Sequence, residues 1–476
     1  MAVHAKHAVS RPPTAPVRET TGHLLLRAYC TLVVFTAFAA SAWNNLLGPA
    51  GFGILIAALA VASVVLWALP TRVRGADAAA RRFDWRRLPW FALLYVAWAL
   101  ASVIWTHWLD ATIITWAILA ATTLQGLFVA SMLTWREIVR SIASALKWVL
   151  GLSLVFELWA ALVTGPILPS FVDPAEPFPK ELYWTRAALF EGGRIQGILG
   201  NANLLGMAAL MAIIVFGIRM AVVPRRGWLI AWTALAVLLS ALAASATALV
   251  CAVAAALVLG TALLMRTAKR PGERTRWYVL YAVIGLGGAA TLWFLRDAIF
   301  GALGRTGDLT GREQIWAAVL ERAWQHPVVG WGYSTPWLPW EPAFDGWIVD
   351  HDLTVFMAHS VWVDVFFQLG FIGVALLALV YLAFTWRSWF FAVDRPRWDL
   401  KADRPYSALT LLPTLTAAVL LVQGLAESRP LMEWGWLMIA LLAFKMKQSP
   451  HLGVGPAEQS LAIERGERPS RPERAP

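Results

Sequence analysis

From Trp228 to Met265 the chain reads WLIAWTALAVLLSALAASATALVCAVAAALVLGTALLM, a run that contains no charged residue. A helix needs about 20 apolar residues to cross roughly 30 Å of hydrocarbon, so this run is too long for one crossing. We therefore predict two helices that are joined by a tight turn near Ser245. A chain with such a run is predicted to lie in a membrane.

Similar apolar runs recur along most of the sequence. Because each is close to the length that one crossing requires, they predict about twelve membrane-spanning helices. The predicted fold class is therefore all-α, a polytopic integral membrane protein. The runs cover residues 24–43, 51–69, 88–109, 111–133, 141–163, 202–221, 227–243, 244–265, 277–296, 360–386, 407–426 and 431–445.

The composition supports this class of protein. Hydrophobic residues make up 59% of the chain and charged residues only 14%. A soluble fold would lack the polar surface to cover so much apolar material, so lipid must cover the rest. The net charge of +11 would suggest nucleic acid in a soluble protein. Here the basic residues flank the spans and face anionic headgroups, so we predict membrane lipids as partners and no nucleic acid.

The distribution of basic residues predicts the orientation of the chain. Short cytoplasmic loops collect Lys and Arg. The basic residues concentrate in the connections 72–87, 136–147, 219–226, 266–276 and 387–404. We place these connections in the cytoplasm, and both termini are then predicted to be cytoplasmic.

The same topology defines the domains. A transmembrane domain is predicted over residues 23–447, between polar segments, 1–22 and 448–476, whose composition predicts disorder in the cytoplasm. Two predicted external loops, 164–201 and 297–358, are longer than a connection requires. The second is a large extracytoplasmic loop between the ninth and tenth helices. Loops of this length in a compact protein are usually functional or disordered.

The second loop is too aromatic for disorder and is predicted to fold back onto the membrane surface. Its tryptophans are Trp316, Trp324, Trp331, Trp337, Trp340 and Trp347. Thr310 and Glu313 have the spacing of a capping box that opens a short amphipathic helix. Arg312 then lies in the first turn, beside unpaired backbone donors. A helix N-terminus with an arginine fork is a favourable place for a phosphate group.

Three groups of residues resemble motifs of the O-antigen ligase and polymerase family of bacterial membrane glycosyltransferases. The first precedes a predicted span, the second lies in the large loop, and the third opens the helix that follows the loop. They are Gly193–Gly197 with Asn201–Gly206, Gly311–Trp316 with His326–Tyr333, and Ala358–Ser360 with Gln368–Gly373.

The sequence departs from the family pattern at two places. Ala202 stands where the family has the proline of an Asn-Pro-Asn element. Ser245-Ala246-Thr247 stands where the family often has Ser-Arg after its seventh helix, so no role of that arginine is carried over.

The resemblance implies a function and a location. Members of this family move a glycan from a polyprenyl diphosphate carrier to a lipid, glycan or protein acceptor. The expected protein is thus a multi-pass enzyme of the bacterial plasma membrane with an extracytoplasmic active site, in cell-surface polysaccharide assembly. The family implies no cofactor and no metal. Asp350-His351-Asp352 could hold a divalent ion, but no further carboxylate is clustered with it, and we interpret it as a solvated loop turn.

The residues of the three motifs suggest roles. A diphosphate leaving group needs its charge held, and arginine meets phosphate with a planar fork. We assign Arg194 and Arg312 to the donor diphosphate, with Arg305 as a further candidate. His359, at the membrane end of a helix, is the predicted general base toward the acceptor hydroxyl. Substrate-binding roles are predicted for Arg305, Asn201, Asn203 and Trp331.

Each assignment has a plainer alternative. His359 could be a hydrogen-bonded helix cap, and the arginines could extend toward lipid headgroups. Tryptophans near a membrane usually belong to an aromatic belt rather than stack on sugars. Glu157 and Asp364 lie inside predicted spans, where a charge is costly, and are expected to face the bundle interior.

Two alternative functions stay open within these observations. A polysaccharide polymerase of the same family would differ from a ligase only in its acceptor, which the sequence does not indicate. A transporter or flippase would move the lipid-linked glycan without breaking its bond, but the inverted repeats typical of many transporters are absent from the sequence.

Overall fold

The computed structural model describes residues 21–68, 85–172, 179, 182–224, 226–268, 272–302, 312–350, 353–394, 406–450 and 452. The predicted N-terminal and C-terminal disordered segments lie almost wholly outside these residues, although Thr21 and Gly22 already belong to the first helix. Arg305, Thr310, His351 and Asp352 are also outside the described part of the chain.

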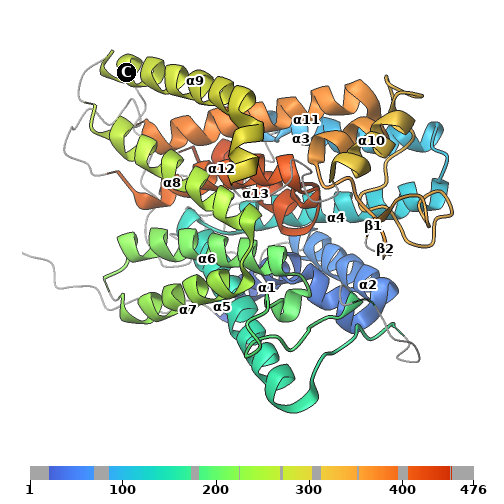
Figure 1. The fold of residues 1–476 in the computed structure, drawn as a ribbon. Coiled ribbons are helices and arrows are strands. Elements are labelled where there is room, and N and C mark those ends of the chain that lie inside the picture. The colour runs from blue at the N-terminus through green and yellow to red at the C-terminus, as the bar shows by residue number, and fades with distance from the viewer. Residues whose placement is uncertain are drawn as a thin grey trace, which may run out of the picture.

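The described chain is almost entirely helical, and this confirms the predicted all-α class (Figure 1). The helices are α1 Thr21–Phe38, α2 Ala40–Ala68, α3 Trp90–Ala101, α4 Leu109–Met132, α5 Trp135–Trp159, α6 Ala202–Val222, α7 Gly227–Ala243, α8 Ala246–Arg266, α9 Glu273–Ala302, α10 Arg312–Ala323, α11 Val361–Val393, α12 Leu411–Ala426 and α13 Glu433–Gln448. A short antiparallel pair, β1 Val349–Asp350 and β2 Leu353–Thr354, lies beyond α10.

The length and hydropathy of these helices make the chain a polytopic membrane protein. Within the described ranges, eight helices are long and apolar enough to cross a membrane, and Trp90–Ile104 and Gly227–Ala243 are shorter apolar helices. Each predicted apolar run overlaps a helix. The figure of about twelve crossings remains a prediction, because α9 and α13 do not meet the same criteria.

The long uncharged run divides where the sequence predicted. Helix α7 ends at Ala243, and Ala244 adopts a left-handed conformation with φ of 45°. Ser245 then caps α8, because its hydroxyl accepts a hydrogen bond from the Ala248 amide at 3.2 Å. The tight turn brings the end of α7 and the start of α8 to the same end of the bundle.

Helix α13 lies at the centre of the bundle, and its side chains are mostly buried (Figure 1). It packs against α4 at Gly126, where an added Cβ would come within 2.9 Å of the Ala440 Cβ and 3.1 Å of the Leu437 oxygen. Small residues permit such close approach of helices in membranes. The packed pair of α4 and α13 is contacted by α1, α2, α3, α11 and α12.

Helix α11 is broken at Gly370, whose φ of 62° and ψ of −165° are not helical. The break frees backbone groups, and the segment Pro327–Gly332 pairs with them. Gly332 donates to the Gln368 oxygen at 2.9 Å, and Phe371 donates to the Pro327 oxygen at 2.8 Å. The loop motif and the motif in α11 therefore form one backbone-paired unit, which fixes the loop to the helix.

The described part of the segment between α9 and α11 is folded, as its many tryptophans indicated. Helix α10 lies on α11 with Ile315, Val319 and Ala323 buried. The tryptophans of this segment mostly pack into a cluster with Trp108 and Phe367. Helix α10, β1 and β2 gather at one end of the bundle (Figure 1).

Candidate functional site

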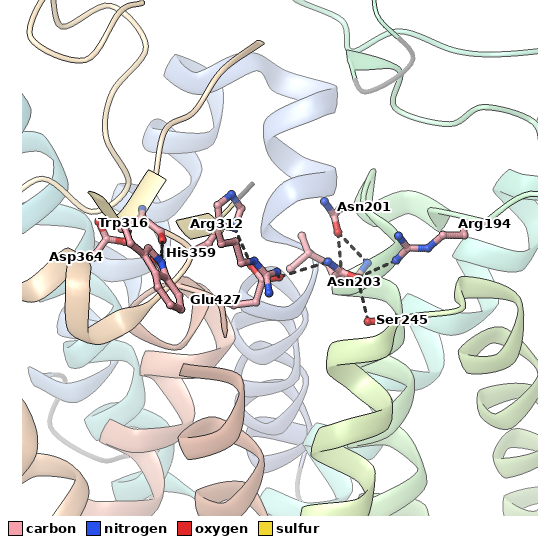
Figure 2. A network of polar contacts seen from close by, with 12 residues as sticks. Arg194, Asn201, Asn203, Ser245, Arg312, Trp316, His359, Asp364 and Glu427 are labelled. Atoms are coloured by element: carbon pink, nitrogen blue, oxygen red, sulfur yellow. Dashed lines mark hydrogen bonds and ion pairs between the residues drawn. The ribbon is translucent and has the colours of Figure 1, made fainter. Parts of the chain in front are cut away.

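A single carboxylate, Glu427, joins residues that lie far apart in the sequence (Figure 2). It follows directly after α12 in an extended conformation and is 7% exposed. Its Oε1 accepts hydrogen bonds from Arg312 Nη2 at 3.2 Å and from Asn203 Nδ2 at 3.3 Å. Its Oε2 lies 3.3 Å from His359 Nδ1. Glu427 is thus the centre of the candidate site.

Asn203 carries the network from Glu427 to Arg194. Its side-chain oxygen accepts hydrogen bonds from Arg194 Nη2 at 2.8 Å and from the Ser245 hydroxyl at 3.0 Å. These two donors fix the orientation of the amide, so that its nitrogen faces Glu427. Asn201 has a different task, because its side chain caps α6 by accepting from the Asn203 and Leu204 amides.

Arg194 is held at the C-terminal end of α7. Its Nε donates to the Ala243 oxygen at 3.0 Å, one of the carbonyl groups that the end of a helix leaves unpaired. A positive charge there is also favoured by the helix dipole. Among the described residues, Nη1 of Arg194 has no hydrogen-bond partner. Arg194 is therefore fixed in place and still has donors for an anion.

Arg312 is the first described residue of α10 and has one polar contact within the described chain, its bond to Glu427. Its side chain is 22% exposed. Its Nε and Nη1 groups have no partner in that part of the protein. The predicted place of Arg312 in the first turn of a helix is confirmed, whereas the capping threonine, Thr310, lies outside the described residues.

His359 has a backbone conformation that most side chains avoid, with φ of 51°. Holding a residue there costs on the order of 1–3 kcal/mol and requires support from the surroundings. The preceding peptide supplies it, because Ala358 donates its amide to Asp364 at 3.1 Å and accepts from Trp316 Nε1 at 2.8 Å. The imidazole is thereby directed toward Glu427.

Trp331 is not part of this network. Its indole donates to the Arg322 oxygen at 2.8 Å, and its ring lies 4.6 Å from the His107 ring and 4.3 Å from the His326 ring. Arg322 lies over Trp331 and Trp347 at 5.1 and 4.7 Å. Burial lowers the pKa of Arg322. The structure assigns Trp331 to the packing of the loop, and its role toward substrate stays a prediction.

Two further groups from the sequence analysis lie wholly or partly outside the described residues. Arg305 lies outside the described residues. Asp350 pairs with Leu353 between β1 and β2, but His351 and Asp352 fall in the gap that follows it. Among the residues that the structure describes, no three His, Cys, Asp or Glu side chains are grouped so that they could hold a metal ion.

Glu427 was not among the predicted site residues. It stands one residue beyond the predicted span 407–426 and two residues before Arg429. An acidic residue at the end of a span, on the same side as the candidate arginines, was the available signal. Without the tertiary structure, however, a short connection with Glu427 and Arg429 is equally typical of a solvated turn.

The network has the chemical groups for two tasks. Guanidinium donors that are not otherwise engaged can bind the oxygens of a phosphate. An imidazole that faces a carboxylate through Nδ1 can hold a proton there and leave Nε2 free to accept another. The arrangement combines an anion-binding element with an acid–base group.

Comparison with known proteins agrees with the motifs. A sequence model of the family described as O-antigen ligase matches residues 229–378. This stretch, about a third of the chain, is similar to that family. The matched region contains Arg312, Trp331 and His359, whereas Arg194, Asn203 and Glu427 lie outside it.

A curated relative is the exopolysaccharide production protein ExoQ of Rhizobium meliloti (strain 1021). It is 31% identical over 137 residues, which are 26% of this chain and 30% of the relative. The chain therefore spans less than a third of the relative's length in this match. Together with the match to the O-antigen ligase family model, this likeness confirms the family resemblance that the motifs indicated.

Proposed function

We propose that this protein transfers a glycan from a polyprenyl diphosphate carrier to an acceptor hydroxyl, in polysaccharide or glycoconjugate assembly at the cell surface. The observation that carries the proposal is the connection of Arg194, Arg312 and His359 through Asn203 and Glu427 (Figure 2). Three candidate side chains from separate helices and loops are thus joined by one continuous set of hydrogen bonds. Arginines that only bind lipid headgroups would not need these connections.

In the proposed reaction the acceptor oxygen attacks the anomeric carbon of the donor glycan. His359 Nε2 accepts the hydroxyl proton, while Glu427 holds the proton on Nδ1. The bond from sugar to diphosphate breaks, and its electron pair stays with the phosphate oxygen. Arg194 and Arg312 stabilise this developing charge with donors that are already in position.

The site is proposed to face the extracytoplasmic side. The ends of α7 and α12 and the starts of α6, α8 and α11 meet at the network, and all are ends that the charge distribution predicts to be outside. At their other ends, Arg266 donates to the Ala392 oxygen and to Thr410, both at 2.8 Å. This separation of helix ends supports the predicted topology.

Thiol labelling tests this orientation. Asp345 and Thr267 are both exposed and lie on the predicted outer and inner sides. An impermeant thiol reagent should label Asp345→Cys in intact cells and Thr267→Cys only after lysis. Protection of Asp345→Cys until lysis would overturn the orientation.

The decisive experiment uses the purified full chain with a polyprenyl diphosphate oligosaccharide. Release of free lipid diphosphate together with transfer of the sugar to an added acceptor supports the proposal. Movement of intact donor across a vesicle membrane, with no bond broken, would support a flippase instead. Comparing a lipid acceptor with a glycan acceptor separates a ligase from a polymerase.

We further propose that transfer needs no divalent cation, because the two arginines already supply positive charge at the diphosphate. A chelator should leave the rate of transfer unchanged. Loss of activity with EDTA and its recovery with magnesium or manganese would contradict this assignment.

A further inference from the structure

We propose that Asp364 and Ser428 form a latch that sets the position of His359 relative to Glu427. Asp364 lies in the first turn of α11 and is 1% exposed, and Ser428 is fully buried. The inference rests on the proposed function, and it assigns Asp364 as a positioning residue, because its hydrogen bonds in the described structure go to Ala358, Ser428 and Gln368 and not to His359 or Glu427.

The latch joins the two chain segments that carry the reacting pair. Asp364 Oδ2 accepts a hydrogen bond from the Ala358 amide at 3.1 Å and another from the Ser428 hydroxyl. Ala358 directly precedes His359, and Ser428 directly follows Glu427. One carboxylate oxygen therefore connects the backbone beside the base with the residue beside its carboxylate partner.

The second oxygen of Asp364 is also engaged. Gln368 Nε2 donates to Oδ1 at 3.4 Å, and Gln368 Oε1 accepts from the Ser334 amide at 2.9 Å and from Thr335 Oγ1 at 2.8 Å. These bonds orient the Gln368 amide, so its nitrogen must face Asp364. An asparagine at 364 would either place its own donor against that nitrogen or lose the bonds of Oδ2.

The conformation of His359 gives the latch a specific task. A histidine with φ of 51° returns to a more favourable conformation unless the peptide before it is held. The bond from the Ala358 amide to Asp364 holds that peptide. The bond from the Ser428 hydroxyl to Asp364 holds the neighbouring Glu427 opposite the imidazole. Loss of either bond should displace the imidazole from the acceptor, whereas Arg194 keeps its own bonds to the Ala243 oxygen and to Asn203.

Ser428→Ala is the central test, with Asp364→Asn as a second variant. The matched control is Ser388→Ala, which removes a buried serine hydroxyl of α11 whose hydrogen bond within the described residues is to the local Thr385 oxygen. Each purified full-length protein is given a polyprenyl diphosphate oligosaccharide, and donor affinity, the rate of transfer at saturating donor and the melting temperature are measured.

We expect Ser428→Ala to lower the rate of transfer about 10- to 100-fold, the scale of a misplaced reacting group, with a much smaller fall in donor affinity. Asp364→Asn should lower it at least as much, and Ser388→Ala should not change it. A normal rate in Ser428→Ala, or a parallel fall of rate and donor affinity, would overturn the latch. If the wild-type protein binds the donor but transfers nothing, the proposed function itself fails.

Discussion

Two buried carboxylates inside the membrane helices hold the two sides of the site in different ways. On the Arg194 side, Glu157 of α5 accepts from the Gln196 and Gly197 amides at 2.8 and 2.6 Å and from Thr185 Oγ1 at 3.1 Å. On the His359 side, Asp364 of α11 accepts from Ala358 and Ser428. Both carboxylates are 1% exposed, so the prediction that they face the interior is confirmed.

The difference lies in where the donors come from. Within the described residues, the donors to Glu157 belong to one loop, residues 182–197, which also contains Arg194. Glu157 therefore fixes this loop to α5. Apart from Gln368 of the same helix, the donors to Asp364 belong to two separate segments, so this carboxylate sets the spacing between them. The comparison predicts that changes on the Arg194 side weaken donor binding, and that changes on the His359 side slow the transfer step.

The largest expected effect is on the His359 side. His359→Ala removes the proposed base, so the rate of transfer should fall by roughly two to four orders of magnitude while the donor still binds. His107→Ala is the matched control, because that ring contacts His326 and Trp331 outside the network. If donor affinity collapses while the residual rate at saturating donor is normal, His359 belongs to the donor side and the comparison is wrong.

The next effect concerns Arg312, which shares Glu427 with His359 but is proposed to act on the donor. Arg312→Lys keeps the charge and loses the planar fork, so we expect the rate of transfer to fall about 100-fold, the scale of one lost transition-state donor. Arg274→Lys serves as control, since Arg274 pairs with Asp394 at the other end of the bundle. A folded Arg312→Lys protein with wild-type rates would mean that Arg312 only meets headgroups.

A smaller effect should follow from a change of Glu157, which fixes the Arg194 loop to α5. Glu157→Gln keeps one acceptor oxygen but places an amide donor near the backbone donors of the loop. We expect a destabilisation of about 1–3 kcal/mol from the unsatisfied groups, together with weaker donor binding. Thermal unfolding and equilibrium binding of the donor measure the two effects. Unchanged donor affinity with a slower transfer step would contradict the division between the two sides.

The smallest effect should come from Trp316, which supports the peptide before His359 from the carbonyl side. Trp316→Phe keeps an aromatic ring and removes the hydrogen bond to the Ala358 oxygen. One such bond contributes about 1 kcal/mol, so the rate of transfer should fall about fivefold with donor affinity retained. Trp347→Phe, a change within the aromatic cluster of the loop, should leave the rate as it is.

Much of the architecture was predictable because it depends on local properties of the chain. Span length and uncharged runs determine where helices cross a membrane, and the turn at Ser245 follows from a run that is too long for one helix. The amphipathic helix after Arg312 was visible from its apolar period. These features need no knowledge of which helices are neighbours.

The site was predictable only in part. Arg194, Arg312 and His359 could be selected as polar residues near predicted membrane ends and from the family motifs. Their connection could not, because Glu427 and Asn203 are 224 positions apart along the chain and meet only after α6 and α12 have packed. The same packing placed Trp331 beside Arg322 in the aromatic cluster of the loop, a position that the loop sequence alone does not indicate.

The sequence by itself determined the class of protein, the helices and the chemical groups that lie near their ends, since hydrophobicity and chain length act on each segment separately. Only the tertiary structure decided which of these groups touch. It revealed Glu427 as the shared partner of Arg312 and His359, and it paired the loop glycines with the break in α11. Hydrogen bonds between distant segments depend on distances of about 3 Å, and such distances are set by the packing of all helices together.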